Sequence, residues 1–312
     1  MHDLFERWHP PRLPAKPSGQ TGILPPPVST HLHLSGRGLT DVPADLPSDA
    51  VTLDLRGNAL TAVPDRVWEL RALRSLSLVG NPLGELPAGV GRLRELRGLY
   101  VAGTPIDALP DTVGELTELH TINIAHNRLT GLPASFARLA KLEVLYLAEN
   151  ALAAVPEPVR ELRALTYLGL NDNPLGALSE WLGELRALVE LRAQRTGLRE
   201  LPRTIGGLAA LRELYLEGNA IERLPDTIGD LRELRHLDLR TNALTELPAT
   251  VDGWRSLRTL DLRANRLTDL PPQLAELPAL EKLDLRWNPL HDGLPPTAER
   301  LRERGFVVLH SP

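Results

Sequence analysis

The chain of 312 residues contains no cysteine, which excludes disulfide bonds, thiolate metal ligands and cysteine nucleophiles. It also lacks an apolar run long enough to cross a bilayer, so we expect no membrane partner. Residues 1–11 mix acidic and basic side chains and lack the apolar core of a secretory leader. These absences together favour a cytoplasmic protein.

Neither sign of charge dominates the chain. It carries 35 Lys and Arg against 40 Asp and Glu, a net charge of −5, which provides no electrostatic attraction for nucleic acid. Lysine is scarce, because Lys16, Lys141 and Lys282 are the only ones. A GC-rich bacterial genome is one explanation of this arginine bias, and avoidance of ubiquitination inside a eukaryotic host is another.

Aromatic residues make up only 4% of the chain, whereas leucine recurs at fixed spacing. The segment from Leu53 to Leu60 represents the repeated unit, and the position of Asn58 returns every 23 residues. Asn81, Thr104, Asn127, Asn150, Asn173, Thr196, Asn219, Asn242, Asn265 and Asn288 occupy it. A slightly shortened unit, Leu32 to Leu39, precedes the series. A fixed period of this length is the signature of a solenoid, here of twelve units.

Each unit is predicted to form one turn of a coil. The pair Leu145 and Leu147 alternates with period two, which indicates a short strand with one face inward. The following Asn can donate and accept, so we expect it to satisfy backbone groups at the turn, with Thr104 and Thr196 doing so in part. Proline such as Pro133 is expected at the first position of a short helix.

Strands joined by such crossovers are parallel, and the connection is right-handed. The predicted fold class is therefore an α/β solenoid with a parallel sheet on the concave face and short helices on the convex face. We assign residues 1–30 to a proline-rich N-terminal extension, 31–296 to the repeat domain and 297–312 to a C-terminal cap. In the cap we expect a helix at 297–304 that ends at Gly305, then a strand at 306–309.

The pattern between Leu211 and Leu231 resembles the 23-residue leucine-rich repeat. It is most similar to intracellular Ras-group and scribble-type scaffolds and to leucine-rich-repeat proteins of bacteria, and the resemblance covers residues 31–296. It implies a module that holds a protein or peptide on its concave face, and it names no ligand. Some bacterial effectors with such repeats are ubiquitin ligases, but their catalytic domain depends on a cysteine.

All four tyrosines fall at positions predicted to face the concave side. Aromatic side chains among mixed polar groups are typical of protein interfaces, although tyrosine is also favoured in strands for its own sake. The predicted binding residues here are Tyr100, Asn123, Tyr146, Tyr167, Arg192, Tyr215 and Glu217. Nearby, Ala193 and Thr196 make the eighth unit irregular, which indicates either a specificity site or drift.

The last units repeat an Asp-Leu-Arg sequence that stacks an acidic column beside a basic one. These charges form either self-neutralising ladders or a docking strip for a charged partner segment. The residues that we predict for such a strip are Asp238, Arg240, Asp261 and Arg263. Calcium is disfavoured there because the guanidinium groups oppose it. His31 and His33 could form a metal pair, but nothing completes the site, and we expect no metal.

The sequence contains no phosphate-binding glycine loop, no nucleophile with a base placed by the repeat, and no paired carboxylates in an apolar pocket. We therefore expect a non-catalytic protein-binding scaffold without a cofactor. The alternative is a secreted bacterial effector that acts on a host protein.

Overall fold

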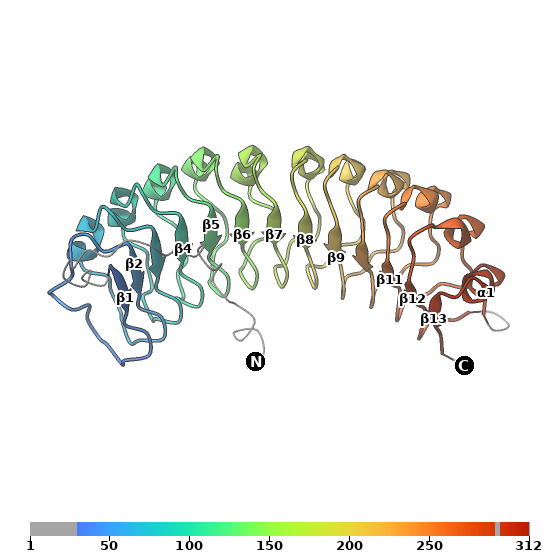
Figure 1. Cartoon of the computed structure of the whole chain (residues 1–312), viewed down its shortest axis with the longest axis horizontal. Coiled ribbons are helices and arrows are strands. Elements are labelled where there is room, and N and C mark those ends of the chain that lie inside the picture. The colour runs from blue at the N-terminus through green and yellow to red at the C-terminus, as the bar shows by residue number, and fades with distance from the viewer. Residues whose placement is uncertain (1–29, 291–293, 312) are drawn as a thin grey trace, which may run out of the picture.

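The computed structural model describes residues 30–290 and 294–311. Within these ranges, thirteen three-residue strands form one parallel sheet in sequence order, along the inner side of an arch (Figure 1). The strands are β1 (His31–His33), β2 (Thr52–Asp54), β3 (Ser75–Ser77), β4 (Gly98–Tyr100), β5 (Thr121–Asn123), β6 (Val144–Tyr146), β7 (Tyr167–Gly169), β8 (Glu190–Arg192), β9 (Glu213–Tyr215), β10 (His236–Asp238), β11 (Thr259–Asp261), β12 (Lys282–Asp284) and β13 (Val307–Leu309). The predicted solenoid fold is confirmed.

The outer side of the arch is formed by short 3-10 helices (Figure 1). They are η1 (Asp65–Glu69), η2 (Ala88–Arg92), η3 (Asp111–Glu115), η4 (Ala134–Arg138), η5 (Glu157–Glu161), η6 (Glu180–Glu184), η7 (Ile205–Gly207), η8 (Asp226–Asp230), η9 (Ala249–Gly253) and η10 (Pro272–Glu276). The expectation that proline occupies the first helical position is wrong for Pro133, which precedes η4 with an extended ψ of 150°. Its carbonyl accepts the N–H of Phe136, three residues on, which is the tighter 3-10 pattern.

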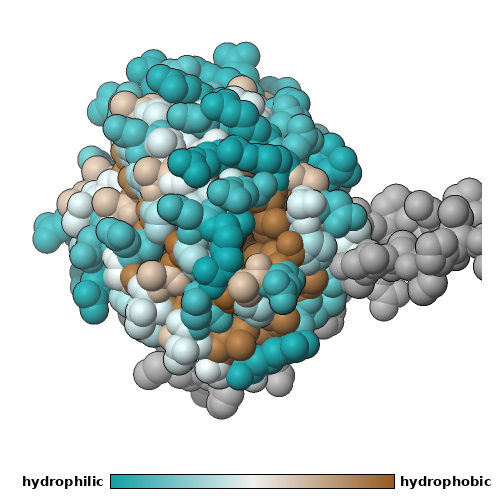
Figure 2. All heavy atoms as spheres, turned by 90° about the vertical axis from the view of Figure 1, so that its left-hand side faces the viewer, coloured by the Kyte–Doolittle hydropathy of each residue, from teal (hydrophilic) through white to brown (hydrophobic). Residues whose placement is uncertain are grey.

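The two ends of the solenoid differ. At the C-terminal end, α1 (Pro296–Glu303) and β13 cover the last coil, and Gly305 follows the helix with a φ of +89°. At the N-terminal end, Leu32, Leu34 and Leu39 are only partly buried, whereas the corresponding leucines of interior coils are fully buried. Figure 2 accordingly shows hydrophobic surface on this end, surrounded by hydrophilic side chains.

The recurring asparagine connects each coil to the one before it. Asn173 donates from Nδ2 to the carbonyls of Leu170 at 2.8 Å and Leu147 at 2.9 Å, and its Oδ1 accepts the N–H of Leu152 at 3.1 Å. The same three bonds recur at Asn58, Asn81, Asn127, Asn150, Asn219, Asn242, Asn265 and Asn288. The predicted role of asparagine is confirmed.

Threonine replaces this asparagine at two positions. At both, the N–H of the preceding coil that an asparagine would bind is already bonded to a carbonyl of its own turn. Thr196 donates to the carbonyl of Ala193 at 2.8 Å, as an asparagine would, but its side chain does not reach the preceding coil's N–H. In that coil, Asn173-Pro-Leu-Gly176, the N–H of Leu175 bonds to the carbonyl of Asn173, and Gly176 has a φ of +68°. Thr104 follows another such Asn-Pro-Leu-Gly segment, residues 81–84, with the same bonds. The threonine of the eighth unit is thus compensated within the backbone.

The residue before each asparagine or threonine has a positive φ. Glycine holds this position at 57, 80, 103 and 218. His126, Glu149, Asp172, Arg195, Thr241, Ala264 and Trp287 hold it elsewhere, with φ between 52° and 62°. Since an L-residue in this conformation costs roughly 1–2 kcal/mol, these seven coils carry a strain that the glycine coils avoid.

This strain predicts opposite effects for two exchanges at one position of the repeat. Replacing Thr241 with glycine is expected to raise the free energy of unfolding by about 0.5–1 kcal/mol, because the relieved strain exceeds the entropy cost of glycine. Gly103→Ala is expected to lower it by about 1 kcal/mol without a steric clash, since the added Cβ would lie 3.9 Å from the nearest atom. Urea unfolding followed by circular dichroism measures both. Midpoint shifts in the same direction would contradict the backbone explanation.

Candidate functional site

The register of the sheet aligns the outward side chains in three columns on the concave face. The column directly after the inner leucine runs through Tyr100, Asn123, Tyr146, Gly169, Arg192, Tyr215, Asp238 and Asp261. Tyr167 lies in the column before that leucine, paired with Val144 and Glu190. Glu217, Arg240 and Arg263 follow the strands in the third column. The structure thus places all eleven predicted residues on the concave face.

Three of the tyrosines stand over β4 to β7, and two of them are in ring contact. The ring centroids of Tyr146 and Tyr167 are 4.6 Å apart, with the ring planes tilted by 43°. The ring of Tyr100 lies over Gly98 and that of Tyr167 over Gly169, where an added Cβ would come within 3.0 and 3.1 Å of ring atoms. Each ring can lie along the sheet because glycine occupies the other outward position of its strand.

The fourth tyrosine belongs to a charged group on β8 and β9. The guanidinium of Arg192 lies over the Tyr215 ring at 4.7 Å from its centroid, and its Nε contacts Glu190 at 2.5 Å. The Tyr215 hydroxyl donates to Glu213 at 2.7 Å. Burial raises the pKa of Tyr215, and the bond to Glu213 raises it further. This tyrosine is therefore already engaged by the protein itself.

Burial also raises the pKa values of Tyr100, Tyr146 and Tyr167 above the ordinary value of 10.0. A phenol whose pKa is raised stays protonated at neutral pH and can donate a hydrogen bond. The three rings are partly exposed. The cluster therefore offers flat apolar rings together with hydroxyl donors.

Strands β3 to β7 carry no charged side chain at any of their three outward positions. We call this surface the neutral strip, and it consists of Ser75, Ser77, Val79, Gly98, Tyr100, Ala102, Thr121, Asn123, Ala125, Val144, Tyr146, Ala148, Tyr167, Gly169 and Asn171. Because 24% of the whole chain is charged, this neutrality is a property of the surface and not of the composition. Depletion of charge around aromatic anchors is typical of the centre of a protein interface.

A charged rim borders the neutral strip at the positive-φ positions of four successive coils. The His126 Nδ1 atom lies 2.8 Å from Glu149 Oε2, and Arg195 Nε lies 2.6 Å from Asp172 Oδ1. Although burial opposes it, the bonds from Arg195 and Asn171 lower the pKa of Asp172. The sequence pattern already places these four residues on the concave side, but the predicted binding set did not include them. They hold a position where five other units have glycine.

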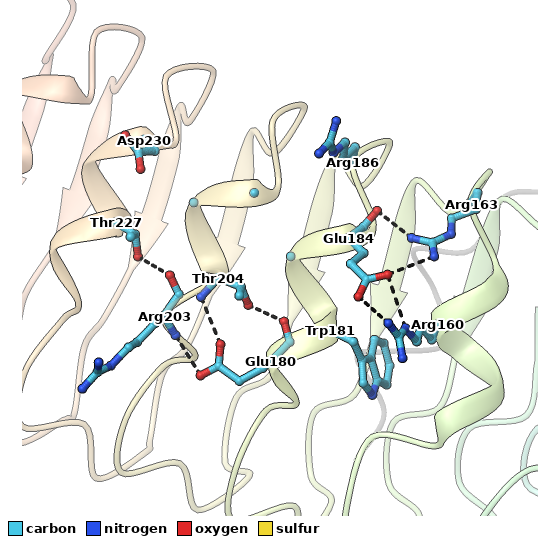
Figure 3. Close-up of a pocket in the computed structure, with 13 residues that line it drawn as sticks. Arg160, Arg163, Glu180, Trp181, Glu184, Arg186, Arg203, Thr204, Thr227 and Asp230 are labelled. Atoms are coloured by element: carbon cyan, nitrogen blue, oxygen red, sulfur yellow. Dashed lines mark hydrogen bonds and ion pairs between the residues drawn. The ribbon is translucent and has the colours of Figure 1, made fainter.

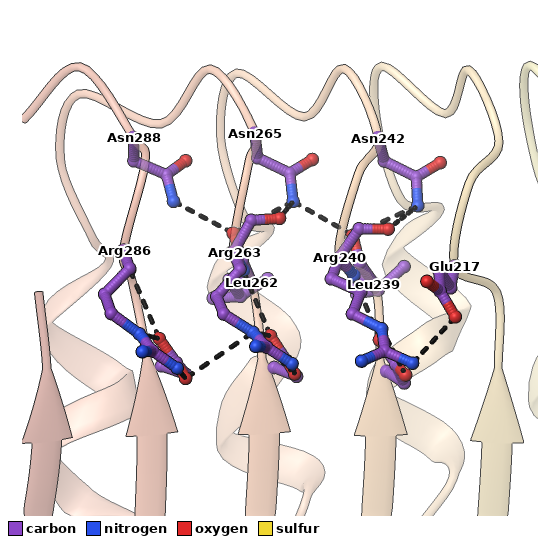
Figure 4. A network of polar contacts seen from close by, with 12 residues as sticks. Glu217, Leu239, Arg240, Asn242, Leu262, Arg263, Asn265, Arg286 and Asn288 are labelled. Atoms are coloured by element: carbon purple, nitrogen blue, oxygen red, sulfur yellow. Dashed lines mark hydrogen bonds and ion pairs between the residues drawn. The ribbon is translucent and has the colours of Figure 1, made fainter. Parts of the chain in front are cut away.

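The predicted Asp and Arg columns are paired internally (Figure 4). Arg240 contacts Glu217 at 2.7 Å, Arg263 contacts Asp261 at 2.5 Å, and Arg286 contacts Asp284 at 2.6 Å. Arg263 also lies 3.5 Å from Asp284, which connects neighbouring coils. Each guanidinium thus faces a carboxylate of its own or an adjacent coil. This geometry favours self-neutralising ladders over a docking strip for a charged partner.

The convex side has a hollow of about 1040 Å³ around η6, which the sequence analysis did not anticipate. Figure 3 shows Trp181 beside it, with Glu184 held by Arg160 at 2.8 Å and Arg163 at 3.0 Å. Glu180 accepts the backbone N–H groups of Arg203 and Thr204. The signals in the sequence were Ser179 in place of proline and a tryptophan two residues later. Its acidic groups at 180 and 184 are engaged within the fold.

The structure also bears on a metal pair at His31 and His33 and on a membrane-spanning segment. His31 Nδ1 lies 3.0 Å from the Thr52 hydroxyl. Among residues 30–290 and 294–311, no group of three or more His, Asp or Glu side chains could hold a metal ion. No helix in the described part of the chain is both long and apolar enough to cross a membrane.

Family models agree with the repeat. A model described as a leucine-rich repeat region matches residues 204–288, and one described as leucine rich repeat matches residues 94–152. The chain is a leucine-rich-repeat protein. These matches do not separate one class of leucine-rich repeat from another, so the intracellular 23-residue class stays a prediction. A search of curated proteins found no match.

Solved leucine-rich-repeat structures share the arch. The ectodomain of the Arabidopsis thaliana membrane receptor kinase GASSHO1/SCHENGEN3, in complex with CASPARIAN STRIP INTEGRITY FACTOR 2, is 28% identical with a TM-score of 0.70, over 85% of this chain and 34% of that one. The plant peptide hormone receptor RGFR1 in complex with RGF2 is 26% identical with a TM-score of 0.65, over 90% and 55%. This leucine-rich-repeat chain thus spans about a third and about half of those two chains. An internalin of Listeria monocytogenes, 18% identical with a TM-score of 0.64 over 84% and 82%, shares the fold.

Proposed function

We propose that this leucine-rich-repeat protein is a non-catalytic module that binds a protein or peptide on its concave face, centred on the neutral strip. The observation that carries the proposal is the cluster of Tyr100, Tyr146 and Tyr167 within a charge-free surface. Partly exposed rings lose much of their remaining water contact when a partner covers them, and no ionic group there has to be desolvated.

The surroundings of the strip support the same proposal. On one side the charged rim, and beyond β7 the group around Arg192, provide a polar border of the kind that surrounds an interface core. The two plant receptors, both solved in complex with named factors, show that this fold can hold such ligands. The Asp and Arg columns contribute less in this proposal, because each charge already has a partner within the chain.

The test is an affinity capture from a lysate of the source organism. A variant with Tyr100, Tyr146, Tyr167 and Tyr215 changed to alanine is expected to lose the captured protein, by at least about tenfold, because one well-packed tyrosine anchor contributes more than 1 kcal/mol. Asp261→Asn with Arg263→Gln is the matched control, since it changes two concave residues outside the strip. Far-UV circular dichroism checks that each variant folds. Equal capture by all three proteins would contradict the proposal.

The setting of this binding is a separate proposal. One candidate setting is a cytoplasmic scaffold, and the other is a secreted bacterial effector, which fits the scarcity of lysine. Fusing residues 1–30 to a reporter distinguishes the two, because an effector signal in this segment would carry the reporter across the membrane. Absence of translocation would speak against the effector.

A further inference from the structure

The tyrosines of the neutral strip have a spacing that matches one class of ligand. Tyr100 and Tyr146 stand in the same column on β4 and β6, two strands apart. Neighbouring strands are about 4.8 Å apart, so these two positions are separated by about 9.6 Å along the arch. A polyproline II helix has three residues per turn and rises about 3.1 Å per residue, a pitch of about 9.3 Å. One turn of such a helix therefore spans the two tyrosine positions.

The chemistry of the strip agrees with its spacing. Polyproline II segments bind in grooves lined by aromatic side chains, and they have no internal hydrogen bonds, so their carbonyls need donors. Asn123 lies between the two tyrosines; its Oδ1 accepts the N–H of Ala125, and its Nδ2 has no hydrogen-bond partner among the described residues. The protonated tyrosine hydroxyls are further donors. The residue after each of these strands and its inner residue is a small alanine, so no bulky side chain stands beside the rings there; these are Ala102, Ala125 and Ala148.

The chain itself contains a segment with the required period. Pro11, Pro14 and Pro17 are spaced by three residues, so they would share one face of a polyproline II helix. Thr30 leads directly into β1, and β4 is three strand spacings away, about 14 Å. The thirteen residues from Pro17 to Thr30 could span about 40 Å even in this conformation, so the segment can reach the strip.

We propose that residues 11–17 bind the neutral strip of their own chain as a polyproline II helix that runs across the strands. Because the segment starts from the β1 end, Pro17 lies against Tyr100 and Pro14, one turn farther, lies against Tyr146. This inference rests on the proposed function, since it assigns an occupant to the same surface. A partner must then displace the segment, and a proline-rich segment of similar period is the ligand class that competes best.

The absence of cysteine allows a direct test in the full-length chain. Ser18→Cys introduces a single attachment site for a nitroxide label next to Pro17. The expected result is strong broadening of the amide signals of β4 and β5 in a nitrogen-15 spectrum, and little broadening over β10 to β12. Changing Pro14 and Pro17 to alanine, or Tyr100 and Tyr146 to alanine, is expected to remove the broadening. Changing Pro25 and Pro26 to alanine is the matched control and is expected to preserve it.

Three outcomes would overturn the proposal. Broadening confined to β1 and β2 would show that the segment covers the exposed leucines of the N-terminal end instead. Broadening in a mixture of labelled, isotope-free chains and unlabelled nitrogen-15 chains would show that a second copy is bound. Broadening unchanged by the proline or tyrosine exchanges would exclude the predicted contacts. The nitroxide experiment needs no external partner. If it fails, the affinity capture still tests the proposed function independently.

Discussion

Asn173→Ala is expected to lower the free energy of unfolding by about 3 kcal/mol or more, although it removes only a few atoms. The exchange leaves the N–H of Leu152 and the carbonyl of Leu170 without their side-chain partner inside the stack. A buried backbone group without a hydrogen bond costs about 1–3 kcal/mol. The carbonyl of Leu147 loses one of its two donors and keeps Asn150.

Asn173→Thr separates hydrogen bonding from side-chain volume. Threonine is expected to bond to the carbonyl of Leu170, as Thr196 does to that of Ala193, but it cannot reach Leu152. Its cost should therefore be intermediate, about 1–2 kcal/mol, from the unpaired N–H alone. Urea unfolding of the three proteins under identical conditions measures the order. If alanine and threonine were equally costly, the loss would have to come from packing and not from these hydrogen bonds.

Gly253→Ala is expected to be comparably severe for a different reason. On the convex side, η9 packs so closely on η8 that an added Cβ at residue 253 would lie 1.9 Å from the carbonyl oxygen of Gly229 and 2.8 Å from its carbon. Both are backbone atoms, so relief requires the two helices to separate, and the cost is about 3 kcal/mol.

Gly131→Ala is the matched control for this exchange. Residue 131 has no atom within 4 Å of an added Cβ and no left-handed φ, so its replacement should shift stability by less than about 1 kcal/mol, in the stabilising direction. Thermal unfolding of both variants compares them. A destabilisation of the same size in both would show that the close approach of η8 and η9 is not its cause.

Most of the fold could be predicted from the sequence because every unit repeats the same local rules. The spacing of Leu145 and Leu147 predicts a strand, and the asparagine at the same place in nine of the twelve units predicts that buried backbone groups at the turn are satisfied. The structure adds that these bonds also join neighbouring coils. The period alone also places all four tyrosines on one face. The expected position of proline was wrong for Pro133, which precedes η4 with an extended ψ of 150°.

Features that depend on side-chain conformation or on contacts between neighbouring units were not predicted. The rings of Tyr100 and Tyr167 lie over glycines of their own strands, which requires a side-chain conformation that no pattern specifies. The hollow around η6 is lined by residues of several successive coils, so no motif within one unit specifies it. The pairing of threonine with a preceding Asn-Pro-Leu-Gly was readable in principle, since it occurs at both Thr104 and Thr196, but its meaning needs the turn geometry.

Each described element contacts only the elements of adjacent coils. Gaining or losing one whole unit therefore leaves every remaining coil with the neighbours that it needs, and evolution can lengthen or shorten such an arch in single steps. Each step moves surfaces on either side of the change by one strand spacing, about 4.8 Å. A unit lost between β4 and β6 would put their tyrosines out of phase with a ligand of three-residue period, whereas a pair of units inserted there into the present array would keep them in phase. The number of units between the tyrosines therefore sets the ligand period that the concave face can match.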